Sequence, residues 1–379
     1  MCIRDRLYLG TETGLWVSHN RGGQWTRVKA NLPTTPIYEM KIHPRDNDLI
    51  LATHARGIWI LDDAGIIQQW SKAEAAGTFA FDPEPATAFN QANDKMKGFE
   101  GDMQFLGLNA APGATLAYRL PTDAKQVSWV IRDGNTQVRE IAGEAMANRA
   151  TAGLHIVKWD LRVQPLRPLT PPPGAPAAGG GGGGGGFGGG GNNGPYVLPG
   201  SYRATLRVDG KDVQTVNVTV KGDPDIRITD ADRKTWFDTA KGLHDLQVEA
   251  NGAAEIVQNA SAQMTLLTQQ TRSATIPPGV KTSMDALNTE LERLRRRLGL
   301  GGGGGGFGGG AENVRGRVGQ LKGAIMGSTS VPTTTQMAQI REVRAALPKV
   351  IEDATAAGRK MPALVRDLIG AGVIFTPVK

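Results

Sequence analysis

Residues 16–25, WVSHNRGGQW, hold several of the side-chain types that are found in active-site loops. A hydroxyl, an imidazole and an amide follow one another at Ser18, His19 and Asn20, so the stretch is a candidate site for chemistry. The same groups also serve tight turns, because serine and asparagine side chains bond nearby backbone groups. Two adjacent glycines and a closing tryptophan favour this second interpretation, in which the loop is scaffolding.

The turn interpretation makes predictions for individual residues of this loop. We expect Gly22 and Gly23 to supply the positive φ angles that a tight hairpin needs. Ser18 and Asn20 should bond the loop's own backbone, and the ring of Trp25 should be buried beneath the loop. The polar side chains of the loop would then form hydrogen bonds within the turn and would not be available for catalysis.

The other chemical candidates of this region are isolated. The spacing of its histidines, at positions 19, 43 and 54, matches no metal-site pattern. Asp62 and Asp63 close an expected strand, and neighbouring strand residues point to opposite faces, so the two cannot act together as an acid and a base. Arg56 is the one ligand candidate that we single out, and no catalytic, metal or cofactor-binding residue is predicted.

Short β-strands position these residues. Aromatic or β-branched runs bounded by glycine or small polar residues predict strands at 7–9, 14–18 and 25–28. A second, similar passage predicts strands within 37–42, 49–53 and 57–61. Short strands at even spacing with recurring turn chemistry are typical of β-propeller blades.

A resemblance to a known family supports this architecture. The loop fits the Asp-box pattern Ser-x-Asp-x-Gly-x-x-Trp of bacterial-neuraminidase-type repeats at Ser18, Asn20, Gly22 and Trp25. It departs from the family in having asparagine where aspartate is usual. LILATHARGIWILDD resembles the closing blade of sortilin-like and glycoside-hydrolase-like propellers, with Ala55 where a glycine is more usual. The resemblance implies an Asp box at the blade periphery, and a carbohydrate or protein ligand at the propeller.

Residues 1–91 are therefore expected to hold about two blades of a truncated propeller. A propeller typically has roughly four to eight blades of about 40–45 residues each. We expect the chain to be the C-terminal part of a longer protein, because the opening MCIRDR does not read as the lead-in to a blade strand. The functional centre of the propeller would then lie mostly in other blades.

Residues 110–225 are predicted to form an immunoglobulin-like β-sandwich, after a linker at 92–109. Alternating apolar residues and hairpin turns predict about seven strands, with the aromatic residues in the core. VSWVIRDGNTQVREI and AGLHIVKWDLR resemble immunoglobulin-like modules of flagellar hook-capping proteins and secreted bacterial enzymes, which implies a spacer or docking module. The proline- and glycine-rich segment 163–195 is expected to be a disordered loop, since it cannot bury enough apolar area to fold.

Residues 226–379 are predicted to be a helical hairpin or small bundle with a glycine-rich loop at 299–310. Thr229 or Asp230 provides a helix cap, and TTTQMAQIREVRAALPKVIEDATA and MPALVRDLIGAGV predict two further helices. Spacings of 3 and 4 predict a packed seam at Met284, Leu287, Leu291, Leu294 and Leu298. The arginines between these leucines are expected to form a solvated helix face, because no nucleic-acid motif accompanies them.

Composition narrows the classes of function. Hydrophobic content of 40% and charged content of 21% are ordinary for a globular chain, and a single cysteine excludes an intrachain disulfide. No run approaches the ~20 apolar residues that a membrane helix needs. The net charge of +7 permits acidic partners, but neither a nucleic-acid partner nor a cofactor is predicted. The resemblance implies an extracytoplasmic protein, although no signal peptide is visible in this chain.

The expected fold class is multidomain, mainly β and then α: a partial β-propeller, an immunoglobulin-like sandwich and a helical hairpin or bundle. The resemblance implies a non-catalytic role, binding or structural. Two alternatives stay open. The first is the C-terminal part of a glycoside hydrolase, sialidase-like or glucanase-like, whose catalytic carboxylates lie in other blades. The second is a protein-docking module of the cell envelope. The chain as given is expected to be inactive.

Overall fold

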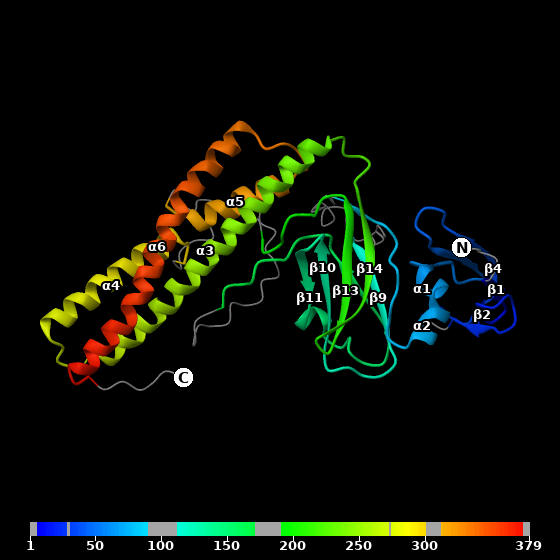
Figure 1. The fold of residues 1–379 in the computed structure, drawn as a ribbon, viewed down its shortest axis with the longest axis horizontal. Helices are drawn as coiled ribbons and strands as arrows, with labels where there is room; N and C mark the ends of the chain where they lie inside the picture. The colour runs from blue at the N-terminus through cyan, green and yellow to red at the C-terminus, as the bar shows by residue number, and fades with distance from the viewer. Residues whose placement is uncertain are drawn as a thin grey trace. The chain divides into compact units, whose positions relative to one another are not determined.

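The computed structural model describes residues 6–28, 31–89, 112–170, 191–272, 274–300 and 312–373. The chain divides into two compact units, residues 1–162 with 196–225 and residues 163–195 with 226–379. The first unit consists of β-sheets with a few short helices, and long helices dominate the second (Figure 1). A mixed fold of β and then α is therefore confirmed. The expected linker at 92–109 lies outside the described residues.

Two antiparallel sheets of three strands each open the first unit. The first sheet contains β1 (Leu7–Thr11), β2 (Gly14–Ser18) and β3 (Thr26–Arg27). The second contains β4 (Ile37–Ile42), β5 (Leu49–Thr53) and β6 (Ile58–Leu61). The short β-rich runs in the sequence predicted these strands, although β3 begins one residue later than expected. A closed ring of sheets is not present among the described residues.

The two sheets pack on each other through one face of each. Leu15 from the first sheet, and Leu49 and Leu51 from the second, are at most 2% exposed and share one buried cluster with Ile37. Burying each such side chain stabilises the fold by about 1.5–3 kcal/mol. The backbone of β1 lies close to β4 at Gly10, where an added Cβ atom would stand 2.9 Å from Cγ2 of Ile37.

Two short helices, α1 (Gly65–Gln68) and α2 (Trp70–Ala76), follow β6. Trp70 stacks on Phe81, with ring centroids 6.2 Å apart, and Phe79 meets the same ring edge-on at 5.2 Å. These aromatic residues pack with Ala117 of the next sheet.

The remaining strands of the first unit form two sheets. Their bounds are β7 (Phe79–Ala80), β8 (Ala86–Ala88), β9 (Ala114–Leu120), β10 (Val127–Asp133), β11 (Thr136–Ile141), β12 (Gly153–Trp159), β13 (Gly200–Val208) and β14 (Lys211–Gly222). The strand orders are β11-β10-β13-β14-β8 and β12-β9-β7. The strands β7 and β8 lie within the range 1–91 that the sequence assigned to the blades, yet they pair with strands of this pair of sheets.

Aromatic pairs from opposite sheets fill the space between them. Tyr118 meets Trp129 with ring centroids 6.1 Å apart, and Trp159 meets Tyr202 at 5.4 Å. All four rings are at most 4% exposed, which confirms the expectation that the aromatic residues form the core. The Tyr202 hydroxyl donates a hydrogen bond of 2.6 Å to the Leu198 carbonyl, so the one polar group of this buried ring is satisfied.

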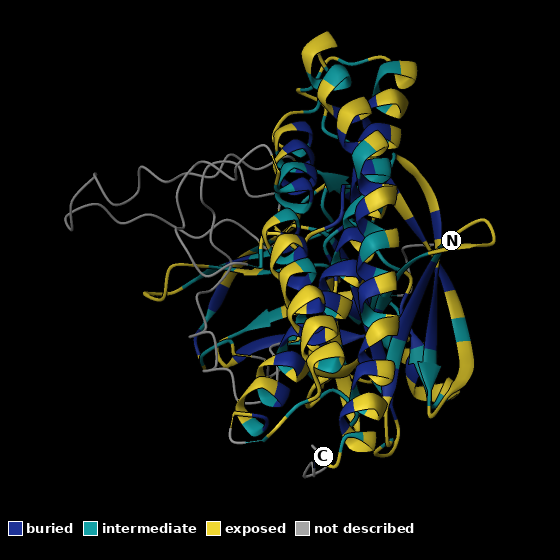
Figure 2. Ribbon diagram, turned by 90° about the vertical axis from the view of Figure 1, so that its left-hand side faces the viewer, coloured by how far each residue is buried: buried dark blue, intermediate teal, exposed yellow. Residues whose placement is uncertain are grey.

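The second unit contains α3 (Asp230–Gln270), α4 (Pro278–Arg297), α5 (Val314–Met326) and α6 (Thr334–Gly370). Of the two predicted cap residues, Thr229 and Asp230, it is Thr229 whose side chain caps α3, by accepting from Asp232 N. The two helices predicted around Pro362 are one continuous helix, α6, which also contains Pro348. Figure 2 shows that each long helix carries buried residues along one side and exposed residues along the other.

Contacts between the helices fix their directions. Gly242 lies against Arg344 and Ile256 against Gly358, so α3 and α6 run parallel. Arg293 pairs with Asp353 and Glu290 with Lys360, so α4 runs antiparallel to α6. The helices α3 and α5 are antiparallel too, because Trp236 contacts Ile325 and Asn251 contacts Arg315. The unit is a helical bundle in which α3 and α6 contact each other directly, while α4 and α5 each pack on both of them.

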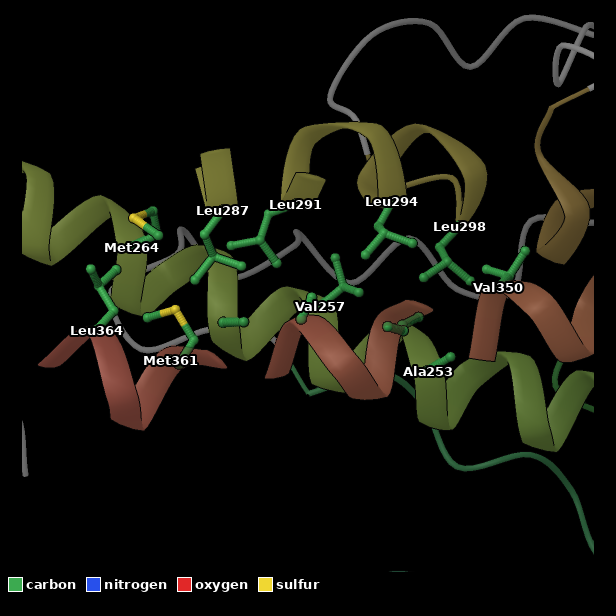
Figure 3. Close-up of a cluster of buried hydrophobic side chains, with 14 of the residues drawn as sticks. Ala253, Val257, Met264, Leu287, Leu291, Leu294, Leu298, Val350, Met361 and Leu364 are labelled. Carbon is green, nitrogen blue, oxygen red and sulfur yellow. The ribbon is translucent and has the colours of Figure 1, made fainter. Parts of the chain in front are cut away.

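The bundle core confirms the predicted seam. Leu287, Leu291, Leu294 and Leu298 are at most 4% exposed and pack against residues of α3 and α6, among them Val257 and Leu364 (Figure 3). Met284, at 8%, closes the same cluster. The alternating spacing therefore located the buried side of α4 correctly.

Candidate functional site

The polar side chains of the loop between β2 and β3 bond the loop itself. The Ser18 hydroxyl donates to Oδ1 of Asn20 at 3.0 Å and accepts from the Gly22 backbone at 2.8 Å. Oδ1 of Asn20 also accepts from the Gln24 backbone at 2.7 Å. These bonds close a compact turn of the kind that serine and asparagine support. They leave the Ser18 hydroxyl committed to the turn, and so ill placed to act as a nucleophile.

Two details of the loop differ from the sequence-based expectation. Positive φ falls on Arg21 (60°) and Gly22 (93°) and not on Gly23. Gly23 is instead a position of close approach, since a Cβ there would stand 3.2 Å from the Asn20 amide. Trp25 is 37% exposed, so its ring lies beside Gly22 but is not buried beneath the loop.

The three histidines and Arg56 do not converge on one site. His43 Nδ1 lies 3.2 Å from Asp46 Oδ2, and His54 Nδ1 lies 2.9 Å from the Tyr38 hydroxyl. His19 is partly buried, and burial lowers the pKa of its imidazole. Arg56 is exposed in the turn between β5 and β6, and its carbonyl accepts a 3.0 Å hydrogen bond from the Trp59 indole.

The structure brings Asp63 together with a residue that sequence reasoning missed. A Cβ atom added at Gly65 would stand 2.8 Å from Oδ1 of Asp63 and 3.4 Å from Oε1 of Glu84. The two carboxyl groups therefore both lie beside Gly65. Glu84 accepts a 2.9 Å bond from Asn47, while Oδ1 of Asp63 is buried without a hydrogen-bond partner. No local sequence motif indicates a role for Glu84, which lies just before β8.

The environment of Asp63 favours its protonated form. Burial is the largest cause, and the nearby carboxylate of Glu84 adds to it, so the pKa of Asp63 rises from 3.8 to about 6. Lys158 and the Gly65 backbone act in the opposite direction without cancelling the shift. Carboxyl groups with raised pKa values are candidates for general acids. The pair is thus the strongest chemical feature of the first unit.

A second set of buried polar groups lies in the helical unit. Lys322 is 0% exposed, and its Nζ donates to the carbonyls of Gly191 at 2.9 Å and Asn193 at 3.1 Å. The segment that Lys322 holds is also hydrogen-bonded to the other end of the predicted loop. Leu166 N donates to Asn192 O, and Val163 N donates to Pro195 O. Both ends of segment 163–195 are therefore held in place, and residues 171–190 of the predicted loop lie outside the described residues.

His244 of α3 shares this neighbourhood. Its side chain is 4% exposed, and burial first, then the charge of Lys322, lowers the pKa of its imidazole to about 4. Neutral at physiological pH, His244 adds no charge next to the Lys322 ammonium. The arrangement anchors a chain segment.

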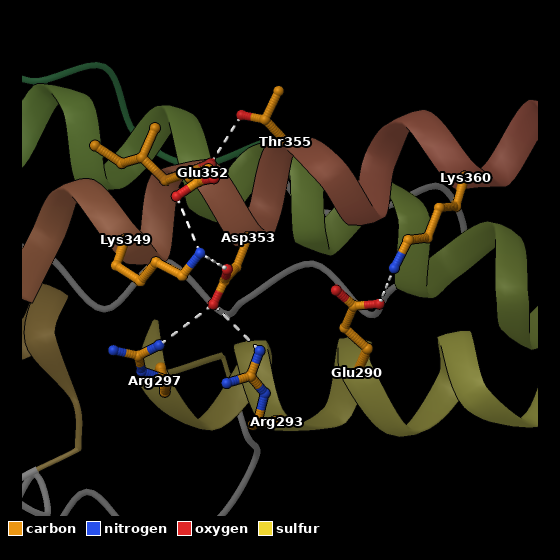
Figure 4. A network of polar contacts seen from close by, with 9 residues as sticks. Glu290, Arg293, Arg297, Lys349, Glu352, Asp353, Thr355 and Lys360 are labelled. Carbon is orange, nitrogen blue, oxygen red and sulfur yellow. Dashed lines mark hydrogen bonds and ion pairs between the residues drawn. The ribbon is translucent and has the colours of Figure 1, made fainter.

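Two arginines of α4, Arg293 and Arg297, form ion pairs with α6. Asp353 lies 3.2 Å from Arg293 and 3.6 Å from Arg297, and Lys349 approaches its other oxygen at 3.2 Å (Figure 4). Burial opposes ionisation of Asp353, but the bonds from Lys349 and Arg293 prevail and lower the pKa of its carboxyl. The arginine-rich stretch thus serves the packing of α4 on α6.

Within the described residues, no group of three or more His, Cys, Asp or Glu side chains is placed to hold a metal ion. Across the same part of the chain, no helix is both long and apolar enough to cross a membrane. Comparisons with models of known protein families and with curated proteins find no match to this chain.

Proposed function

We propose that the chain has a non-catalytic role, structural or binding, and that β1–β6 serve as two neighbouring blades of an Asp-box β-propeller. The observation that carries the proposal is a repeat in the two sheets. Leu9 stands opposite Trp16 in the first sheet, and Leu51 stands opposite Trp59 in the second. The same residue types thus occupy the same register in sheets that pack face to face.

The loop between β2 and β3 supports the non-catalytic part of this proposal. Its serine and asparagine side chains bond the turn, as a structural Asp box requires. The other parts of the chain fit accessory roles: the aromatic residues of the sandwich are buried in its core, and two arginines of α4 pair with α6. An extracytoplasmic location belongs to the same proposal, since it follows from the resemblance to Asp-box propellers.

One observation favours a hydrolase as the second candidate, namely the carboxyl pair of Asp63 and Glu84. A glycoside hydrolase uses one protonated and one ionised carboxyl group on either side of the bond that it cleaves. The raised pKa of Asp63 would suit the acid. Against this role, Glu84 is bonded to Asn47, and Oδ1 of Asp63 is buried within the fold.

A screen with chromogenic glycosides, sialosides and glucans included, separates the two candidates. The matched control is the double variant Asp63→Asn/Glu84→Gln, which keeps size and removes both ionisable groups. We expect the chain and this variant to show the same background rate. Turnover by the chain that the double variant loses would establish the hydrolase and refute the non-catalytic proposal.

A further inference from the structure

Among the described residues, the two sheets at the start of the chain each leave one apolar face uncovered. We name the first outer face 1, made of Leu7, Leu9 and Trp16 on β1 and β2. The second, outer face 2, consists of Ile50, Ile58 and Ile60 on β5 and β6. The strand registers place each set on one side of its sheet, opposite the side buried between the sheets.

The repeat makes each outer face the counterpart of a buried one. Leu7 and Leu9 of outer face 1, which are 42% and 46% exposed, correspond to Leu49 and Leu51, which are 1% and 2% exposed. The correspondence follows from the pairing of Leu9 with Trp16 and of Leu51 with Trp59.

Outer face 2 shows the converse relation. Ile58 and Ile60 are 72% and 57% exposed, whereas Leu15 and Val17, at the corresponding positions of the first sheet, are 1% and 3% exposed. The contact between the two sheets therefore joins a surface like outer face 1 to a surface like outer face 2. Both halves of this contact are present a second time on the outside.

We propose that outer face 1 of one copy of this chain packs on outer face 2 of another copy, head to tail. The inference rests on the proposed function, because it treats the two sheets as blades. Such a contact joins different patches of the two copies, so it propagates into a ring or an open chain of copies. The occupant of each face is thus a second copy, which carries the matching surface.

The charges at the borders of the two faces agree with this partner. Arg27 stands beside Trp16 on outer face 1, whereas outer face 2 is bordered by Glu39 and by Asp62, which follows β6. Lys41, also at this border, is paired with Glu39 at 3.0 Å.

The area of the contact sets its strength. A face of three strands, about 4.8 Å apart and about five residues long, is far smaller than the ~800 Å² per partner of a standard interface. The association is therefore weak and depends on concentration.

Sedimentation velocity of the full chain, from about 10 μM to about 1 mM, measures the association over the range that so small an interface implies. We expect the average mass to rise with concentration. Leu9→Lys, on outer face 1, and Ile60→Lys, on outer face 2, should each weaken self-association at least about tenfold. The control Val248→Lys changes an apolar residue of α3 that is 52% exposed, and it should associate like the unmodified chain.

Mixing the two variants tests the head-to-tail geometry directly. Leu9→Lys retains outer face 2 and Ile60→Lys retains outer face 1, so an equimolar mixture should form one-to-one dimers and nothing larger. A chain that stays monomeric throughout, or a mixture that stays monomeric, would overturn the inference. Either result would leave the blade pair standing, because the packing of Leu15 on Leu49 within one copy is measured separately.

Discussion

Replacing Asp63 by asparagine should stabilise the first unit at neutral pH. The pKa of Asp63 is raised from 3.8 to about 6, mainly by burial and then by Glu84. The folded state thus binds a proton more tightly than the unfolded state does. The stability from this group is complete below pH 3.8 and is lost as the pH rises through about 6. Asparagine keeps the shape and accepts the positive φ of 56° at this position.

The size of the effect follows from the shift. About two pKa units at 1.36 kcal/mol each set an upper bound of ~3 kcal/mol, and partial solvent exposure reduces this to about 1–2 kcal/mol. The free energy of unfolding of Asp63→Asn should therefore equal that of the unmodified chain around pH 4 and exceed it by about 1–2 kcal/mol above about pH 7.

Hydrogen exchange read by mass spectrometry on peptides that cover β4–β6 measures this gain as a function of pH. The control is Asp62→Asn, an exposed neighbour, whose profile should follow that of the unmodified chain. Parallel pH profiles for Asp63→Asn and the unmodified chain, or a loss of stability in Asp63→Asn at neutral pH, would refute the electrostatic reasoning.

Three further predictions concern single positions. Asn20→Ala should destabilise the β2–β3 hairpin by about 1 kcal/mol, through lost turn bonds, in a thermal melt, whereas Asn20→Asp should retain them. Ala55→Gly should raise the free energy of unfolding by about 0.5–1 kcal/mol, because Ala55 has a φ of 58° that glycine adopts without strain; an unchanged urea midpoint would count against this. Lys322→Met removes the ammonium that holds the carbonyls of the 191–195 segment, so the amides of Val163 and Leu166 should exchange at least about tenfold faster.

Sequence patterns located most elements because the patterns are local. The strands of the first unit follow from short β-rich runs, and the seam of α4 follows from helical spacing. The break expected between the predicted helices, at 357–360, did not occur, because the buried residues Ala357, Met361 and Leu364 continue the packed side of α6 across it. Pro362 lies on the exposed side of the helix. Packing of an amphipathic face here outweighs the cost of one missing hydrogen bond.

The parts that sequence reasoning missed depend on contacts between distant segments. Asp63 meets Glu84 only because the chain folds back after α2, and no spacing rule encodes that approach. The ordering of the ends of segment 163–195 comes from Lys322, which is far away in the sequence. Composition predicted disorder there, since it reports only what a segment can bury alone. The exposed ring of Trp25 likewise reflects its surroundings and not its residue type.

The two sheets of β1–β6 form one stacked pair, with Leu15 from the first against Leu49 and Leu51 from the second. A double-mutant cycle of Leu15→Ala and Leu49→Ala, with hydrogen exchange of β1–β6 as the readout, tests it most directly. We expect a coupling free energy above about 0.5 kcal/mol, while the control pair Leu15→Ala and Leu291→Ala should be additive. Additivity of Leu15→Ala and Leu49→Ala within about 0.3 kcal/mol would contradict the stacked pair and the blade role built on it.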